Sequence, residues 1–144
     1  MAEALVDANV IVGYALKRDQ FHEQGREIVR AMDHGDLPLG QVTNYVLPEI
    51  LHPVAKKASH QTSLNLLDRI TQSGGFRIVH LAHEDFTRAQ ALYRRENGVN
   101  FVDAITVAYM QRQDLEYIYT FDDDFDRFDG ITRLTSVSNP FDPE

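Results

Sequence analysis

Four carboxylates stand at the ends of predicted buried segments, where together they could bind a divalent cation: Asp7, Glu49, Asp103 and Asp122. Asp7 and Asp122 each follow a short apolar run that indicates a buried strand. Glu49 and Asp103 each lie near the start of a predicted helix, among apolar neighbours. A carboxylate on a buried face needs a compensating partner, and a metal cation is one. The set is therefore a candidate metal site.

Each of these residues also has a purely structural interpretation. Asp7 could cap the first helix, and Asp103 could be the third-position member of a capping box that begins at Asn100. Glu49 could be a solvated residue near a helix N-terminus. The acidic run 122–126 could be a charged, soluble turn. Spacing and periodicity alone leave both interpretations open for every member of the set.

Other chemistry-bearing patterns are weaker. Glu49 and His52 have the Glu-x-x-His spacing of carboxylate-bridged di-iron helices, but such sites need a second unit, and Pro53 follows directly. His80 and His83 flank a predicted helix start, which is typical of surface residues. The sequence contains no glycine-rich phosphate loop and no strand–serine–helix elbow. These observations favour the carboxylate set over a di-iron, nucleotide-binding or serine-hydrolase site.

Short apolar runs alternate with helical patterns along the chain. Strands are predicted at 4–6, 39–42, 76–79 and 115–120, and helices at 8–16, 21–32, 63–70, 83–95 and from 100 through 109. A further helix should follow an N-cap at Thr43. It contains Pro48 and Pro53, so we expect it to start near Pro48, to kink, or to break at Pro53.

The alternation of strands and helices predicts an α/β fold with a mainly parallel sheet. Ligands of such sheets gather beyond the carboxyl ends of the strands. Two Asp residues that follow separate strands, Asp7 and Asp122, are thus expected to lie side by side.

Length and composition set outer bounds on the protein. The 144 residues fit one domain over 1–144, and 43% apolar residues are enough for a core. With no Cys, the chain has no disulfide and no thiolate metal site. No run approaches the roughly 20 apolar residues of a membrane span, and no signal-peptide pattern opens the chain. We therefore expect a cytoplasmic protein that does not associate with a membrane.

The net charge of -8 is unevenly distributed. Residues 1–113 carry 13 acidic and 12 basic side chains, whereas residues 114–144 carry 9 acidic and 2 basic ones. A generally acidic protein repels nucleic acid, but a local acidic cluster can be neutralised by divalent cations. Only 3 of the 14 basic residues are Lys. An excess of Arg suits bidentate phosphate contacts, and it is equally typical of a salt-adapted or GC-rich source.

Four segments resemble the motifs of a known family. They are Leu5 to Val10 (LVDANV), Thr43 to Glu49 (TNYVLPE), Phe101 to Ile105 (FVDAI) and Thr120 to Phe125 (TFDDDF). In order and spacing, they are similar to the four motifs of the PIN-domain nucleases, in particular the VapC-like toxins of prokaryotic toxin–antitoxin pairs. The resemblance covers nearly the whole chain. It is more specific for the superfamily than for the toxin role.

The resemblance implies a PIN-like three-layer fold and a metal-dependent endoribonuclease that uses Mg²⁺ or Mn²⁺. It carries over four catalytic and metal-binding residues: Asp7, Glu49, Asp103 and Asp122. In the fourth motif, Asp124 or Asp126 could share the metal. Asn9 matches a family position that holds a small polar residue near the site. Oxygen ligands of this kind suit these two cations.

The same resemblance suggests partners. We expect an RNA substrate, a homodimer, and an antitoxin whose basic tail brings an Arg into the carboxylate cluster. The acidic C-terminal segment would be a dock for that tail. Basic residues that could support RNA are Lys56, Lys57, Arg94, Arg95 and Arg127.

Three alternatives compete with the toxin interpretation. A PIN nuclease could process RNA without an antitoxin, or a PIN domain could act as a non-catalytic binding module. A receiver-like phosphoacceptor domain also has an acidic Mg²⁺ site at strand ends. That class needs a Lys after a late strand, and here no Lys follows Lys57.

Overall fold

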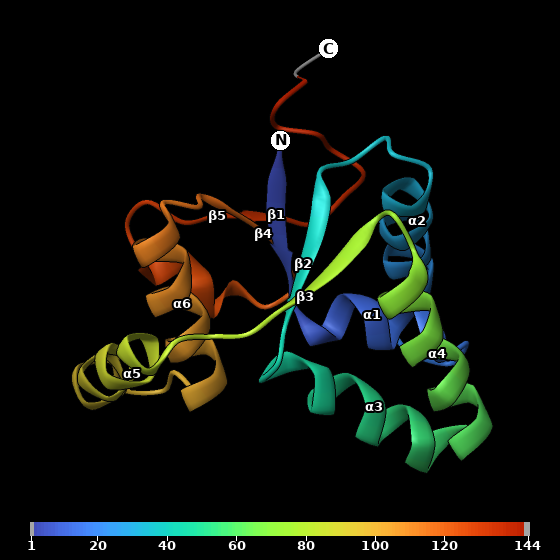
Figure 1. The fold of residues 1–144 in the computed structure, drawn as a ribbon, viewed down its shortest axis with the longest axis horizontal. Coiled ribbons are helices and arrows are strands. Elements are labelled where there is room, and N and C mark those ends of the chain that lie inside the picture. Colours follow the sequence, from blue (N-terminus) through green and yellow to red (C-terminus); the bar gives the residue numbers. More distant parts are fainter. Residues whose placement is uncertain (1, 143–144) are drawn as a thin grey trace.

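The computed structural model describes residues 2–142, which form a three-layer α/β fold around one parallel sheet (Figure 1). The five strands of this part of the chain lie in the order β3-β2-β1-β4-β5, and every neighbouring pair is parallel. Their bounds are β1 Glu3–Val6, β2 Leu39–Thr43, β3 Phe76–Val79, β4 Tyr117–Tyr119 and β5 Thr132–Leu134. The predicted α/β class with a mainly parallel sheet is confirmed.

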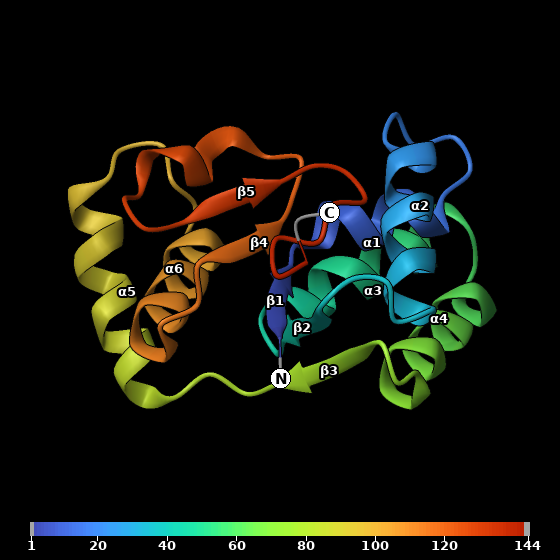
Figure 2. The same ribbon diagram turned by 90° about the horizontal axis from the view of Figure 1, so that it is seen from above.

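Six α-helices and one 3₁₀ helix connect the strands in the described range. Their bounds are α1 Ala8–Ala15, α2 His22–Asp33, α3 Val46–Lys57, α4 His60–Gln72, α5 His83–Arg95, α6 Phe101–Gln113 and the 3₁₀ helix η1 Asp123–Arg127. Helices α1 to α4 cover one face of the sheet, and α5 and α6 cover the other (Figures 1 and 2). Within residues 2–142, no helix combines the length and the apolarity needed to cross a bilayer.

Alternation along the strands divides the core in two. Ala4 and Val6 pack with the apolar faces of α1 to α4, whereas Leu5, between them, packs with α5 and α6. In β4, Ile118 and Tyr119 divide in the same way. Because successive side chains of a strand point to opposite faces, a strand covered on both sides reads as a continuous apolar run. This is why the sequence of β1 shows no polar alternation.

One strand was not expected from the sequence, and one of the three expectations for helix α3 is confirmed. Strand β5 was not predicted, because its three residues, Thr132, Arg133 and Leu134, lack an apolar run. Helix α3 starts near Pro48, as expected, but it continues through Pro53 to Lys57. A proline inside a helix removes one backbone hydrogen bond. The buried side chains of Ile50 and Val54 on either side anchor α3 to the core and hold the helix together.

Helices α1 and α2 pack unusually close together at Gly25. A Cβ atom placed on Gly25 would lie 2.5 Å from the carbonyl oxygen of Val10 and 2.9 Å from the backbone nitrogen of Tyr14. Both atoms belong to the backbone of α1, which cannot move aside as a flexible side chain would. This contact fixes α1, the helix that begins directly after Asp7.

We predict that Gly25→Ala lowers the free energy of unfolding by about 2 kcal/mol, because overpacking forces the two helix backbones apart. Urea denaturation would measure the loss. The matched control is Gly74→Ala, where a Cβ would meet nothing within 4 Å. That variant should change the stability by less than about 0.5 kcal/mol. Equal effects of the two substitutions would contradict the close packing of α1 on α2.

Candidate active site

The candidate site lies beside β1, the strand at which the order of the strands in the sheet changes direction. From β1 the chain proceeds to β2 and β3 on one side, while β4 and β5 lie on the other side of β1. The carboxyl ends of β1 and β4 therefore border a topological switch point, the usual place for a ligand in an open parallel sheet. Asp7 follows β1 directly, and its backbone N–H donates to the carbonyl of Tyr119 at 3.0 Å.

Asp7 is held rigidly by its neighbours. Its Oδ1 accepts a hydrogen bond from the backbone N–H of Ala8 at 2.9 Å, so it is the N-cap of α1. Its Oδ2 accepts a hydrogen bond from the Thr120 hydroxyl at 2.8 Å. The capping interpretation of Asp7 is thus confirmed, and it coexists with a place in the acidic cluster.

Thr120 and Asn9 tie the two strand ends together. The Thr120 hydroxyl accepts hydrogen bonds from the side-chain amide of Asn9 at 3.2 Å and from the backbone N–H of Asp122 at 3.1 Å. The side-chain oxygen of Asn9, Oδ1, in turn accepts a hydrogen bond from the backbone N–H of Phe121 at 3.2 Å. Sequence reasoning missed Thr120. The available signal was a hydroxyl residue placed between a buried strand and an Asp.

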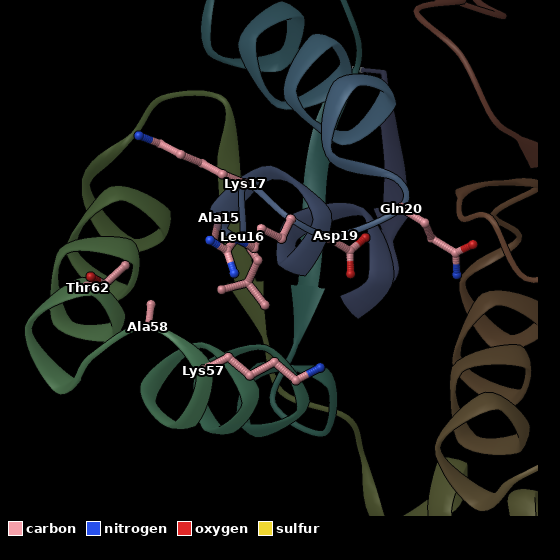
Figure 3. A pocket seen from close by; sticks show the side chains of 9 residues that line it. Ala15, Leu16, Lys17, Asp19, Gln20, Lys57, Ala58 and Thr62 are labelled. Atoms are coloured by element: carbon pink, nitrogen blue, oxygen red, sulfur yellow. The ribbon is translucent and has the colours of Figure 1, made fainter.

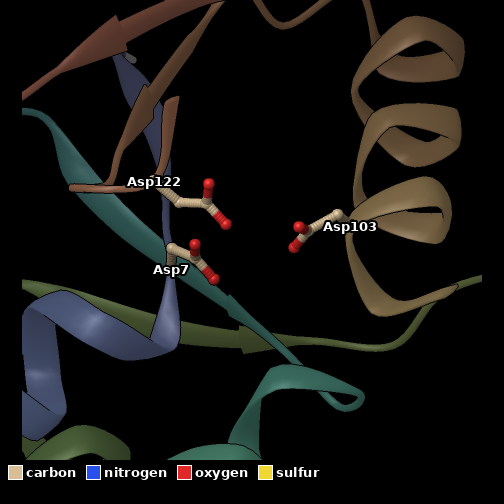
Figure 4. Close-up of side chains that lie close together, drawn as sticks. All are labelled: Asp7, Asp103 and Asp122. Atoms are coloured by element: carbon tan, nitrogen blue, oxygen red, sulfur yellow. The ribbon is translucent and has the colours of Figure 1, made fainter. Parts of the chain in front are cut away.

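Asp103 reaches the same place from the opposite face of the sheet. It lies in the first turn of α6, where its backbone N–H donates to the Asn100 side chain at 2.8 Å. Figure 4 shows its carboxylate facing those of Asp7 and Asp122 across a common space. One oxygen from each of the three carboxylates lies within 4.8 Å of the others.

The Asp103 carboxylate is buried and incompletely paired. Its Oδ2 is the one buried side-chain polar atom of the described chain that has no hydrogen-bond partner. Burial raises the pKa of Asp103 to about 8, and the nearby negative charges, Asp7 first, add to this effect. Burial also raises the pKa of Asp7, against the hydrogen bonds from Thr120 and Ala8. The cluster therefore carries a large electrostatic penalty when all its members are ionised.

The remaining candidates from the sequence lie around this trio. Glu49, on the first turn of α3, is exposed, yet burial of its carboxyl and then the charge of Asp7 raise its pKa. Asp124 forms a second close group with Asp122 and Asp123. Asp126 is exposed, and its two oxygens accept hydrogen bonds from Arg133 at 3.1 and 2.8 Å. Neither Glu49, Asp124 nor Asp126 belongs to the group formed by Asp7, Asp103 and Asp122.

The donor set fits a hard divalent cation. Carboxylate oxygens are the ligands that Mg²⁺ and Mn²⁺ prefer, and a cation would satisfy the unpaired oxygen of Asp103. It would also offset the cost of burying these charges and their mutual repulsion, which together raise the pKa values of Asp7 and Asp103. The chemistry of the residues and the orphaned oxygen both agree with a metal ion at this position.

Comparison with known families assigns the fold. The PIN domain family model matches residues 4–131. The chain belongs to the PIN domain family. This match includes the segments around Asp7, Glu49, Asp103 and Asp122, so the resemblance inferred from the sequence is confirmed at the level of the family.

Solved structures share the fold of this PIN domain. VapC20 of Mycobacterium tuberculosis, a toxin that cleaves the sarcin–ricin loop, is 22% identical with a TM-score of 0.73, covering 85% of this chain and 92% of its own. A toxin–antitoxin complex from Klebsiella pneumoniae is 20% identical, with a TM-score of 0.64 and coverage of 94% and 98%. VapBC2 from Rickettsia felis, bound to a promoter DNA fragment, is 12% identical, with a TM-score of 0.68 and coverage of 92% and 97%. No curated protein matches this chain.

The pKa of Asp103 predicts a pH-dependent stability in the absence of metal. Below the ordinary pKa of 3.8, the carboxyl is protonated in the folded and the unfolded chain. As the pH rises towards about 8, the unfolded chain releases a proton that the folded chain retains, so folding stability decreases. We expect Asp103→Asn to melt several degrees above the natural protein in EDTA above pH 8, with the difference vanishing near pH 4.

Thermal melts in EDTA across this pH range would measure the effect. Saturating Mn²⁺ should raise the melting temperature of the natural protein, because a ligand that binds only the folded state stabilises it. It should not do so for Asp103→Asn. An Asp103→Asn melting temperature that follows the natural protein at every pH would contradict the burial penalty assigned to this carboxyl.

Proposed function

We propose that this PIN domain is a divalent-metal-dependent endoribonuclease that hydrolyses RNA phosphodiester bonds. The observation that carries the proposal is the group of buried Asp7, buried Asp103 and partly buried Asp122 at the switch point, with one Asp103 oxygen unpaired. A protein gains no stability from gathering three like charges where two of them are buried. Such a cluster is therefore best explained by a function that uses its negative charge.

The three Asp residues are the proposed metal ligands, and either Mg²⁺ or Mn²⁺ would suit them. When bound, such an ion supplies positive charge to the scissile phosphate and lowers the pKa of water. Asp7 holds a fixed position through Thr120 and Ala8. Glu49, which is exposed and has a raised pKa, would orient the attacking water and accept its proton. Asp124 groups closely with Asp122 and could share the metal, whereas the carboxylate of Asp126 is engaged by Arg133.

The biological role that fits best is that of the toxin in a type II toxin–antitoxin pair. Similarity in fold to VapC toxins supports this proposal, although identities of 12–22% carry the fold alone. We propose one PIN-like domain over 1–144 that forms a homodimer. Its antitoxin would insert an Arg from a basic tail into the carboxylate cluster, where a cation offsets the repulsion described above. The acidic segment 114–144 would bind the rest of that tail.

Metal-dependent cleavage of RNA is the direct prediction. The pure protein should cleave a mixed single-stranded RNA in Mg²⁺ or Mn²⁺ and not in EDTA. Asp7→Asn and Asp103→Asn should each reduce the rate by about 100-fold, because each removes a charge that holds the metal. Gel electrophoresis of the products gives the rates.

The control is Asp129→Asn, which removes an exposed acidic side chain from the loop after η1 and should leave the rate unchanged. Cleavage that persists in EDTA, or that survives both cluster substitutions, would contradict the proposal. A folded protein that binds Mn²⁺ but cleaves no RNA would favour a non-catalytic PIN module.

The toxin role makes a separate prediction in cells. Expression of the natural chain should arrest growth, and expression of Asp103→Asn should not, because the variant lacks the nuclease centre. Co-expression with a small neighbouring gene that encodes a DNA-binding protein with a basic tail should restore growth. Normal growth during expression of an enzyme that is active on RNA in vitro would favour an RNA-processing nuclease without an antitoxin.

A further inference from the structure

A cleft of about 760 Å³ opens between the loop that joins α1 to α2 and the turn that joins α3 to α4. We call it the basic cleft, because Lys17, Arg18 and Lys57 line it. Figure 3 shows Lys17 on the loop after α1 and Lys57 on α3, on opposite sides of the cleft, with Thr62 of α4 at one end. The chain has only three lysines, and two of them are here.

The charge of the basic cleft is not neutralised. Lys17, Arg18 and Lys57 are all exposed, and none of them forms a salt bridge within residues 2–142. Asp19 is the single acidic residue among those that line the cleft. Its carboxylate accepts a hydrogen bond from the backbone N–H of Phe21 at 3.0 Å. The cleft thus presents an excess of positive charge on a chain whose net charge is -8.

The basic cleft adjoins a second hollow that lies beside Glu49. This hollow, of about 500 Å³, is lined by Asn9, Glu49 and Pro53, and it shares Asp19 and Gln20 with the basic cleft. Asn9 hydrogen-bonds to Thr120, which in turn contacts Asp7. Two adjoining hollows therefore run from the three cations to Glu49 and to Ala8, the residue that follows Asp7.

Two basic residues of the segment that follows Asp122 are already engaged by the protein. Arg127 donates to the carbonyl of Asn97 at 2.7 Å, and Arg133 pairs with Asp126. A polyanion that approaches a cluster of carboxylates needs compensating cations along its path. Cations without a protein partner meet this need best, because they lose no existing ion pair when they bind a phosphate.

We propose that the basic cleft binds the phosphodiester backbone of the substrate RNA on one side of the cleaved bond. Arg18 and Lys57 would contact phosphates, while the hollow beside Glu49 would hold the nucleotide between them and the carboxylates. The identity of the polyanion as RNA rests on the function proposed above. The positive charge favours a nucleic acid backbone over the basic tail of a protein partner, which the cleft would repel.

The test compares two double variants that each lose two positive charges. Arg18→Gln with Lys57→Gln removes cations from the basic cleft. Arg30→Gln with Arg88→Gln removes two exposed cations that do not line it. The probe is a fluorescently labelled, mixed-sequence, single-stranded RNA of about 20 nucleotides, and its anisotropy is measured in EDTA over a range of salt concentrations.

We expect the cleft variant to bind this RNA about tenfold more weakly, and its plot of log affinity against log salt to be shallower by about 1.4, the value for two lost phosphate contacts on a single strand. The control variant should change the affinity by less than about twofold. Both variants should melt like the natural protein. Equal weakening by the two variants, no weakening by the cleft variant, or no RNA binding by the natural chain would overturn the proposal.

A small diester separates this proposal from the proposed function. Hydrolysis of bis(p-nitrophenyl) phosphate requires the carboxylates, but this substrate is too small to reach the basic cleft. The cleft variant should therefore hydrolyse the small diester at the natural rate, although the same variant cleaves RNA more slowly. If RNA binds through the basic cleft but is never cleaved, the proposed RNA-binding role of the cleft is supported and the proposed nuclease activity is contradicted. If Asp103 is required for cleavage and both double variants bind RNA equally, the nuclease activity is supported and the RNA-binding role of the cleft is contradicted.

Discussion

The parallel pairing of β1 with β4 is the constraint on which the candidate site depends. In this pairing Leu5 lies opposite Ile118 and Val6 lies opposite Tyr119. Each strand sends alternate side chains into two different cores, so a slip of one residue would exchange every side chain between the cores. Core packing therefore fixes the register. The register in turn fixes the distance between the residues that follow the two strands, Asp7 and Asp122.

Two buried carboxylates of this protein show how pairing separates a structural role from a candidate functional one. The Asp85 side chain is 1% exposed, and its burial opposes ionisation. Hydrogen bonds from Arg112 at 2.7 and 2.9 Å, and one from the backbone N–H of Ala82, outweigh that burial and lower its pKa. Asp103 has no such cation, and its pKa is raised to about 8. Asp85 stabilises the junction of α5 with α6, whereas Asp103 is left for a ligand.

Much of this arrangement could be predicted from the sequence, because strand ends and helix starts are marked locally. Asp7 and Asp122 follow apolar runs, and Asn100 is an N-cap residue that marks the start of α6. The approach of Asp103 to the strand ends was not predictable from spacing, because it depends on how α6 packs on the sheet. The resemblance to the PIN-domain nucleases, and not the periodicity, predicted that Asp103 joins Asp7 and Asp122. The same limit applies to Asp126: its ion pair with Arg133 depends on β5, which has no sequence signal of its own.

The central position of β1 has a consequence for protein synthesis. The hydrogen bond from Thr120 to Asp7 joins residues that are 113 positions apart, and the third carboxylate comes from a helix that precedes β4. Contacts between distant parts of a chain form late, because the intervening loop must first be made and closed. A ribosome-bound chain therefore exposes Asp7 long before it acquires Asp122 and the strand that positions it. No partly synthesised chain that stops short of β4 contains the complete cluster, and any chemistry of the cluster has to wait until nearly all of the domain has been released.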